Sequence, residues 1–481
     1  MLFNSVDFAI FLPIVFGLYW FLNNNLKFQN ILLLASSYFF YGCWDWRFLF
    51  LLLFSTLLDY FTGIKIGNTE NRKLRLFWLW LSISINLGFL ATFKYYNFFA
   101  LSFTSLLTNM GLHINPLTIS VILPVGISFY TFHGLSYVID IYKRRIGAEK
   151  NFVDYALFVS FFPLLVAGPI ERATHLLPQI RQPRSFDYHK AVDGLRQILW
   201  GLFKKIVIAD KCATYANMIF DHPEAYPGSA RIIGAIFFAF QIYGDFSGYS
   251  DIALGTARLL GIELLRNFAF PYFSRDIAEF WRRWHISLST WFRDYLYIPL
   301  GGSKGGNWSK IKNTFIIFIV SGFWHGANWT FIMWGILNAL YFLPLLLTNN
   351  NRNNLHIVAE GRTYPTLKEL LSIILTFTLT VFAWIFFRAD SIPHALDYIS
   401  GIFSSSLLSI PHLEGARDAC ITGVLIVFFI VIEWKGRMHQ YALANLELKW
   451  RKTIRYAMYY LLIFLIFWFG GKEQQFIYFQ F

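Results

Sequence analysis

Long apolar runs recur along the whole chain and limit the folds that it can adopt. A helix needs roughly 20 apolar residues to cross the hydrocarbon core of a bilayer, and several runs approach or exceed that length. The runs are Phe8–Leu22, Phe48–Ile64, Leu76–Phe93, Tyr155–Ala167, Ile232–Tyr243, Phe315–Leu347, Leu370–Phe387, Ile421–Ile432 and Met458–Phe469. The shorter runs must lie in a thin or irregular region or extend into their polar flanks. We therefore expect an all-α polytopic membrane protein with about ten to twelve transmembrane helices.

The composition agrees with this reading. The chain is 56% hydrophobic and contains 54 Phe, 26 Tyr and 17 Trp in 481 residues. A soluble domain has nowhere to bury so many large apolar side chains, whereas a bilayer does. We expect a single membrane domain over residues 1–481, with scaffold spans in 1–110, a functional core in 120–348 and further spans in 366–481.

The positions of Lys and Arg predict an orientation in the membrane. A net charge of +13 could suggest nucleic acid, but the bases lie in short loops, as the positive-inside rule requires. Met1–Asp7 contains no Lys or Arg, so we expect the N-terminus outside. Lys27 and the cluster in Lys65–Arg75 then lie inside. The bases in Lys449–Arg455 precede the last apolar run, which predicts that the C-terminus is also outside.

No pattern in the sequence predicts a metal or nucleotide site. Cys43, Cys212 and Cys420 are too widely separated for a metal-ligand spacing, and we expect small buried hydrophobes there. The loop Gly301–Gly306 is rich in glycine but lacks the Gly-Lys-Ser/Thr order of a phosphate-binding loop. We expect it to be a flexible turn.

The centre of the chain differs from both ends. From about Ile122 to Trp334, Gly, Pro and charged residues repeatedly interrupt the apolar runs. Non-helical backbone survives at membrane depth only where protein buries it or a water-filled cavity solvates it. The sequence therefore predicts re-entrant, broken and interfacial helices around a central funnel. We expect His133 to be a packed residue and the polar segment Asn349–Arg362 to be a surface connection.

His325 is the strongest candidate for a reactive group. It lies in Ser321–Trp329, between long apolar runs. Ionisable residues at membrane depth usually mark a pathway or a reaction centre, and histidine moves protons near neutral pH. The alternative is a histidine that a neighbouring carbonyl satisfies.

The apolar segment around His325 is too long for one span. Thr314–Thr348 would measure about 52 Å as a single straight helix. Ser321-Gly322 and Gly326 are natural breaks, which would place His325 beside a discontinuity that faces a cavity. Trp324 and Trp329 would then form flat walls, and Asn328 would be a nearby hydrogen-bond partner. The alternative for the tryptophans is an interfacial belt.

A second constellation spans Phe280–Tyr295. Large apolar side chains recur there at helical spacing on one face and polar ones on another. The apolar face comprises Trp281, Trp284, Leu288, Trp291 and Tyr295, and the polar face comprises Arg282, His285, Ser289 and Arg293. A continuous helix of this kind suits the wall of a funnel, and its basic face could receive an anionic group, such as the phosphates or pantetheine arm of an acyl carrier. The alternative is an ordinary interfacial helix that binds lipid headgroups.

Two carboxylates close the apolar run that ends near Tyr243. Asp245 and Asp251 need partners at this depth, and Arg282, Arg283 or Lys204-Lys205 could supply them. We favour this structural role. The alternative is that the acids orient a catalytic histidine.

Taken together, these motifs resemble the membrane-bound O-acyltransferase (MBOAT) family, in particular its bacterial AlgI-like branch of polysaccharide O-acetylation proteins. The likeness covers nearly the whole chain. It is carried by Phe280–Leu300 followed by Ser321–Trp329, and also by Pro124–Asp140, Phe161–Arg172, Lys204–Asp210, Gln241–Gly261 and the C-terminal Phe476–Phe481.

The resemblance implies that His325 is the membrane-embedded catalytic histidine and that His285 supports it, by shaping the tunnel or helping to bind the donor. Moving an acetyl group from a thioester to a hydroxyl requires a base and a group that stabilises the oxyanion. His325 would be the base, and Asn328 or nearby backbone N–H groups would face the oxyanion. The candidate donor-binding residues are Arg282, Arg283, Trp324 and Asn328. We expect no metal and no permanently bound cofactor.

We therefore expect a bacterial inner-membrane O-acyltransferase. It would take an acetyl group from a cytoplasmic thioester, acetyl-CoA or an acyl carrier protein, and pass it to an envelope polysaccharide such as alginate or to a periplasmic or membrane-anchored acetyltransferase partner. Peptidoglycan O-acetylation and teichoic-acid D-alanylation remain alternatives within this class. Alternatives of other classes are a transporter or flippase with a relay of His325, Asp245 and Asp251, and a non-catalytic membrane scaffold.

Overall fold

The computed structural model describes residues 1–120, 122–166, 168–445, 450–471, 474 and 476–477. Within these residues all regular structure is helical, and no strand occurs. Ala167, Lys449 and residues 478–481, which belong to segments named above, lie outside the described residues. The chain forms two compact units. Unit 1 comprises Met1–Val192 and Thr256–Leu265, and unit 2 comprises Asp193–Gly255 and Arg266–Phe481.

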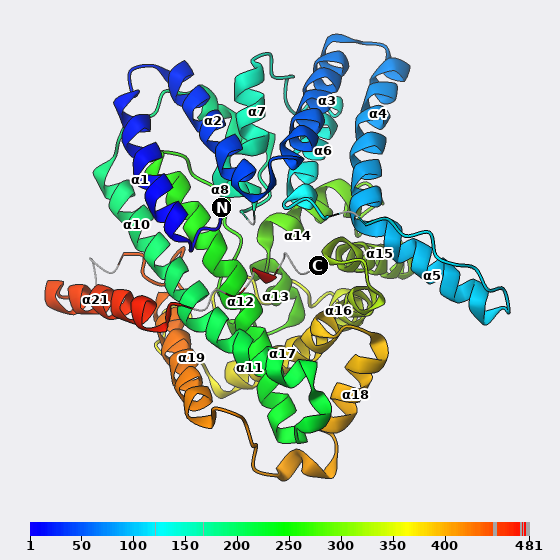
Figure 1. Ribbon diagram of the computed structural model, residues 1–481, viewed down its shortest axis with the longest axis vertical. Coiled ribbons are helices and arrows are strands. Elements are labelled where there is room, and N and C mark those ends of the chain that lie inside the picture. Colours follow the sequence, from blue (N-terminus) through cyan, green and yellow to red (C-terminus); the bar gives the residue numbers. More distant parts are fainter. Residues whose placement is uncertain (121, 167, 446–449, 472–473, 475, 478–481) are drawn as a thin grey trace. The chain divides into compact units, whose positions relative to one another are not determined.

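Unit 1 is built from successive helices, with a long connection between the fifth and sixth α-helices (Figure 1). They are α1 (Val6–Phe21), α2 (Leu26–Asp45), α3 (Phe48–Asn68), α4 (Arg72–Leu90), the π-helical η1 (Ala91–Tyr95), α5 (Tyr96–Asn109), α6 (Ile127–Tyr142), α7 (Phe152–Ser160), α8 (Phe162–Leu165) and α9 (Ala173–Arg181). The first residues of α10 and the last turn of α12 also belong to this unit. Helix α5 has no buried residue.

Polar side chains join the apolar helices α3, α4 and α6 inside unit 1. Asp59 accepts hydrogen bonds from Ser82 Oγ at 2.6 Å and from Asn86 Nδ2 at 2.8 Å. A Cβ atom at Gly134 would lie 1.9 Å from an Asp59 oxygen, so only glycine lets α6 approach this cluster. The partners satisfy a carboxylate that is 1% exposed, which removes the cost of burying it alone. His133, also on α6, is 1% exposed and accepts a hydrogen bond from the Glu171 N–H at 3.1 Å, as expected of a packed residue.

Unit 2 contains the remaining helices. They are α10 (Tyr188–Leu202), the π-helical η2 (Phe203–Ala209), α11 (Asp210–Asp221), η3 (Pro223–Ala225), α12 (Gly228–Leu259), η4 (Pro271–Phe273), α13 (Ile277–Arg283), α14 (Ile286–Phe292), η5 (Arg293–Tyr297), α15 (Asn307–His325), α16 (Trp329–Leu347), α17 (Leu367–Arg388), α18 (Ile392–Ile402), η6 (Ser405–Leu408), α19 (Ala416–Gly436) and α21 (Lys452–Phe469). Long helices alternate here with very short ones.

Six helical segments among the described residues are long and apolar enough to cross a membrane. They are Phe48–Asn68, Arg72–Asn109, Trp329–Leu347, Leu367–Arg388, Ala416–Gly436 and Lys452–Phe469. The all-α polytopic fold is thus confirmed, although ten to twelve spans were expected. Phe8–Leu22 forms the shorter apolar helix α1. Tyr155–Ala167 divides between α7 and α8, because Pro163 cannot donate the hydrogen bond that would continue α7.

Candidate active site

His325 is the last residue of α15, at a tight turn between α15 and α16. Gly326 ends the first helix and Asn328 caps the second. The predicted break at Gly326 is therefore confirmed, whereas Gly322 lies inside α15 and serves packing. A Cβ atom at Gly322 would lie 2.2 Å from the carbonyl oxygen of Phe331 on α16. Small residues thus let the two helices close around the turn that carries the histidine.

Aromatic rings surround the His325 imidazole. The residue is 4% exposed. Its ring lies edge-on to Trp334, with centroids 5.2 Å apart, and edge-on to Phe387 at 5.3 Å. Trp324 contributes a third edge contact at 5.0 Å. Rigid rings with edge-to-face geometry hold the plane of the imidazole.

His285 lies at a break between two short helices. The predicted continuous helix over Phe280–Tyr295 is wrong: α13 ends at Arg283, and α14 begins at Ile286. His285 itself has φ 44° and ψ 55°, a left-handed conformation that is uncommon for a side chain of this size. The break turns the chain at the histidine, which is 1% exposed.

Asn267 explains why this break is stable. Its Oδ1 atom accepts hydrogen bonds from the Ser287 N–H at 3.3 Å and from Ser287 Oγ at 2.7 Å, and lies 3.2 Å from His285 Nδ1. Its backbone oxygen accepts from the Ile286 N–H at 2.9 Å. One asparagine therefore caps α14 in place of the missing helical turn.

The same contacts define the state of the His285 ring. A backbone N–H can only donate, so the Asn267 atom that it contacts is the oxygen, and Nδ1 of His285 must carry the proton. Nε2 is buried and has no hydrogen-bond partner among the described residues. His285 lies outside the six candidate spans, and burial lowers its pKa to about 3. The ring is therefore neutral at neutral pH, with Nε2 as a proton acceptor.

A row of packed aromatic rings connects the break at His285 with the turn that carries His325. Trp284, next to His285, is 1% exposed and packs 5.1 Å from Trp384 of α17. Trp384 stacks in turn on Trp334 at 5.6 Å, and Trp334 contacts His325. This continuous wall holds the break and the α15–α16 turn in a fixed relation. Neither Trp284 nor Trp384 can shift without disturbing the other.

Both histidines line one cavity in unit 2, with a volume of about 500 Å³. The centroids of the His285 and His325 rings are 6.5 Å apart. Arg282, Ser289 and Arg293 also line the cavity, so every residue of the predicted polar face reaches it even though the helix is broken. The space has room for a small substrate group between a basic rim and two imidazoles.

The polar segment Asn349–Arg362 contributes to the cavity, although it was expected to be only a surface connection. Asn351 and Arg352 line the cavity. Arg282 donates hydrogen bonds to the backbone oxygens of Asn351 at 2.7 Å and Asn354 at 2.9 Å. The arginine thus fixes this segment beside the site, a role that no local sequence signal indicated.

The structure separates the other predicted donor-binding residues from the cavity wall. Arg283 forms an ion pair with Glu279 at 2.8 Å and lines a second, polar cavity of about 700 Å³, which Arg282 also lines. Trp324 lies behind the histidines, with its ring 6.1 Å from that of His285. Asn328 accepts from the Thr330 N–H at 3.1 Å and donates to the Asp390 oxygen at 2.8 Å. Its amide is engaged at the helix start.

Lysines are the partners of the two buried carboxylates. Lys204 Nζ lies 2.5 Å from Asp251, and Lys205 Nζ lies 2.8 Å from both Asp245 and Asp210. The pairing occurs where η2 packs on α12. The structural role that we favoured for Asp245 and Asp251 agrees with this geometry. In the described part of the chain, no group of three or more His, Cys, Asp or Glu residues could hold a metal ion.

Comparison with known proteins identifies relatives over most of the chain. The profile of the membrane-bound O-acyltransferase family matches residues 143–387. The chain is 38% identical over 439 residues to the probable alginate O-acetylase AlgI of Pseudomonas aeruginosa, covering 91% of this chain and 81% of that protein. It is 32% identical over 528 residues to the peptidoglycan O-acetyltransferase of Helicobacter pylori, covering 100% and 98%. A shorter match, 31% over 237 residues, is to the teichoic acid D-alanyltransferase of Streptococcus thermophilus, covering 45% and 55%.

The region that matches the family profile contains the whole cavity. Its lining residues lie between Ala278 and Leu355, inside the matched range 143–387. The two buried histidines are therefore part of the family region and not of an addition to it. With this match and with full-length relatives above 30% identity, the chain belongs to the membrane-bound O-acyltransferase family and is an O-acyltransferase.

Proposed function

We propose that this protein transfers an acetyl group from a cytoplasmic thioester donor to a hydroxyl of a cell-envelope polysaccharide, either directly or through a periplasmic acetyltransferase partner. The observation that carries the proposal is a pair of buried imidazoles, with centroids 6.5 Å apart, on the wall of one cavity. The named activities of two relatives that match most of the chain, alginate and peptidoglycan O-acetylation, support acetyl as the group. The protein would lie in the inner membrane with both termini outside.

His325 is the proposed general base. The acceptor hydroxyl is a weak nucleophile at neutral pH, so a base must remove its proton as the oxygen attacks the thioester carbonyl. The new C–O bond forms, the C–S bond breaks, and the proton passes through the imidazole to the departing thiolate. The aromatic wall of Trp334 and Phe387 keeps bulk water from the ring, which protects the thioester from hydrolysis.

His285 is proposed to position the substrate. Its Nε2 atom is a proton acceptor without a partner among the described residues, so it can receive a hydrogen bond from the acceptor hydroxyl or from an amide N–H of a pantetheine arm. Arg282 and Arg293 on the same wall would attract the phosphates of the donor. Acetyl-CoA and an acyl carrier protein both present this chemistry.

Replacing His325 tests the proposal. In cells whose envelope O-acetylation depends on this protein, we expect His325→Ala to reduce ester content by on the order of 10²–10⁴-fold, measured as acetate released by mild base and normalised to protein amount. The matched control is His222→Ala, because that side chain is 75% exposed and should leave ester content unchanged. Wild-type ester content in His325→Ala at normal protein level would refute the assignment.

A second measurement separates transfer from transport. Purified protein supplied with radiolabelled acetyl-CoA should release one thiol for each ester formed, either on an added oligosaccharide or on an added periplasmic acetyltransferase partner. A transporter would move an unchanged solute into proteoliposomes instead. The acidic residues that a relay would need, Asp245 and Asp251, lie in ion pairs with Lys205 and Lys204, which favours the transfer reaction.

A further inference from the structure

A small polar cavity in unit 1 is separate from the proposed active site. It has a volume of about 240 Å³ and lies where the loop before α10 meets the ends of α1 and α12. Its charged lining residues are Arg184, Lys190 and Arg258, together with one carboxylate, Asp187. Nothing in the acyl-transfer mechanism uses this site. Its excess of cationic groups indicates an anionic ligand.

Arg184 is the central group of this cavity. Its residue is 8% exposed, and its guanidinium lies over the Tyr19 ring at 5.5 Å. Nη2 donates to Asn30, but Nε and Nη1 are buried without hydrogen-bond partners among the described residues. Buried charged donors without acceptors are costly. Nε and Nη1 lie on opposite edges of the guanidinium, so a phosphate oxygen would accept from one of them and add the attraction of opposite charges.

The nearby carboxylates are directed to other groups. Glu263 accepts from Arg258 Nε at 3.3 Å and lies 3.7 Å from Lys190 Nζ. Asp187 accepts from the backbone N–H groups of His189 and Lys190 at the start of α10. Neither carboxylate pairs with Arg184 in the described contacts. An anion that enters the cavity therefore meets the Arg184 side chain with two further cations, Lys190 and Arg258, in the same lining.

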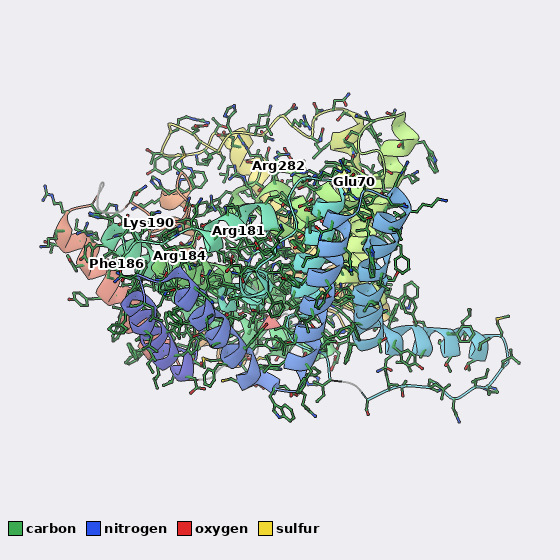
Figure 2. The ribbon with its side chains drawn as sticks, turned by 90° about the horizontal axis from the view of Figure 1, so that it is seen from above. Glu70, Arg181, Arg184, Phe186, Lys190 and Arg282 are labelled. Atoms are coloured by element: carbon green, nitrogen blue, oxygen red, sulfur yellow. The ribbon has the colours of Figure 1, made fainter. Side chains whose placement is uncertain are left out.

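An aromatic edge adjoins the basic cavity. Trp20 lines it, and its indole N–H donates to the Leu259 oxygen at 3.1 Å. Phe186, which is 50% exposed, packs against Trp20 at 5.4 Å and against Phe16 at 6.1 Å. In Figure 2 the labelled side chains of Arg184, Phe186 and Lys190 lie near one another. A free phosphate ion would gain nothing from this apolar edge, whereas a lipid would lay its acyl chains on it.

The predicted orientation points to the same ligand. Lys27, in the first turn of α2, is expected inside by the positive-inside rule, so we place the adjoining end of α1 at the cytoplasmic face. Anionic lipids of that leaflet attract basic groups near the surface. We propose that the cavity of Arg184, Lys190 and Arg258 binds the headgroup phosphate of an anionic phospholipid, with Trp20 and Phe186 against its glycerol and acyl region.

Lipid titration of the full-length protein tests this site. The protein is purified in a neutral detergent, and its Tm is measured with phosphatidylglycerol, with phosphatidylcholine and with sodium phosphate. We expect phosphatidylglycerol alone to raise the Tm, and Arg184→Gln to weaken its apparent affinity about tenfold, the loss of one charge-assisted hydrogen bond. The matched control is Arg47→Gln, also in unit 1, whose side chain is 61% exposed and which should respond as the wild type does.

Three outcomes would overturn the proposal. Equal affinity for phosphatidylglycerol in Arg184→Gln and Arg47→Gln would show that the lipid does not bind at Arg184. Equal Tm shifts with phosphatidylcholine and phosphatidylglycerol would show that the site does not recognise an anionic headgroup. A Tm shift with sodium phosphate but none with lipid would show that the ligand is a free anion. If Arg184→Gln does not fold, Lys190→Gln replaces it, because the Lys190 side chain is 55% exposed and its substitution should not prevent folding. The affinity of Lys190→Gln for phosphatidylglycerol is then compared with that of Arg47→Gln, and equal affinities overturn the proposal.

Discussion

Asn267 should determine both the stability of the His285 break and the protonation of its ring. One Oδ1 atom accepts from the Ser287 N–H and Oγ and from His285 Nδ1, and Asn267 is 1% exposed. Asn267→Ala removes the acceptor of three buried donors while both histidines remain unsubstituted. The variant therefore separates the support of the site from the groups proposed to react.

The magnitude follows from those contacts. A buried donor left without an acceptor costs about 1–3 kcal/mol. Because the Ser287 hydroxyl can rotate and His285 can change tautomer, we expect each of the three donors to cost near the low end of this range. The free energy of unfolding of Asn267→Ala should therefore fall by about 3 kcal/mol. The tautomer change has its own consequence. A proton on Nε2 converts the unpartnered acceptor into a donor, and we expect transfer activity to fall by about 10–100-fold.

The assay compares Asn267→Ala with Asn267→Asp. Thermal unfolding in detergent should show a lower Tm for the alanine variant and a Tm close to wild type for aspartate, which keeps the acceptor oxygens. An anion beside Nδ1 favours the imidazolium and raises the pKa of His285. Because the imidazolium cannot accept at Nε2, the aspartate variant should be inactive at low pH and gain activity as the pH rises above the raised pKa.

Two results would refute this reasoning. An alanine variant with wild-type Tm and wild-type activity would show that Asn267 does not hold the break. An aspartate variant whose pH–activity profile matches that of the wild type would show that the Nδ1 contact does not determine the state of the ring.

Two further predictions concern packing and buried charge. Gly322→Ala should lower the Tm and the activity together, since its Cβ would lie 2.2 Å from the Phe331 backbone oxygen and overpacking costs about 1–3 kcal/mol. The control Gly423→Ala, whose Cβ would have no atom within 4 Å, should leave both unchanged. Equal Tm and activity in the two variants would contradict the close packing of α15 on α16. Asp245→Asn should lower the free energy of unfolding by on the order of 3 kcal/mol, because it removes one of the two carboxylates that pair with buried Lys205. The control Asp45→Asn loses only a pair with the exposed Arg47 and should change the Tm little. Equal Tm losses in the two variants would contradict the role of the buried pair.

Local patterns in the sequence predicted the parts of the site that depend on local chemistry. His325 stood out because a lone imidazole within an apolar run is costly. Helix length required a break in Thr314–Thr348, and of the two proposed positions, Ser321-Gly322 and Gly326, only Gly326 is used. Arg282, His285, Ser289 and Arg293 all line one cavity, but so do Trp281 and Leu288 of the predicted apolar face. For Asp245 and Asp251, charge balance predicted basic partners among Arg282, Arg283 and Lys204-Lys205, and the structure selects the two lysines.

The errors arose where distant residues decide the local conformation. Helical periodicity over Phe280–Tyr295 is real, yet Asn267, 18 positions before His285, supplies the hydrogen bonds that make a break more favourable than a continuous helix. Periodicity carries no information about such a partner. The same holds for Asn351, whose backbone oxygen is held by Arg282, and for Trp384, which lies behind Trp284 and Trp334.

Asn328 also carries a second signal in the sequence. We named Asn328 or nearby backbone N–H groups as candidate donors to the oxyanion. Asn328 also directly precedes the apolar run that forms α16, the position where Asn, Ser, Thr and Asp commonly cap a helix. The structure uses it in this way. Because Asn328 caps α16 and donates to the Asp390 backbone oxygen, we expect backbone N–H groups to face the oxyanion. Asn328→Asp, which can still cap α16, should then keep most activity, whereas an oxyanion role would require its loss.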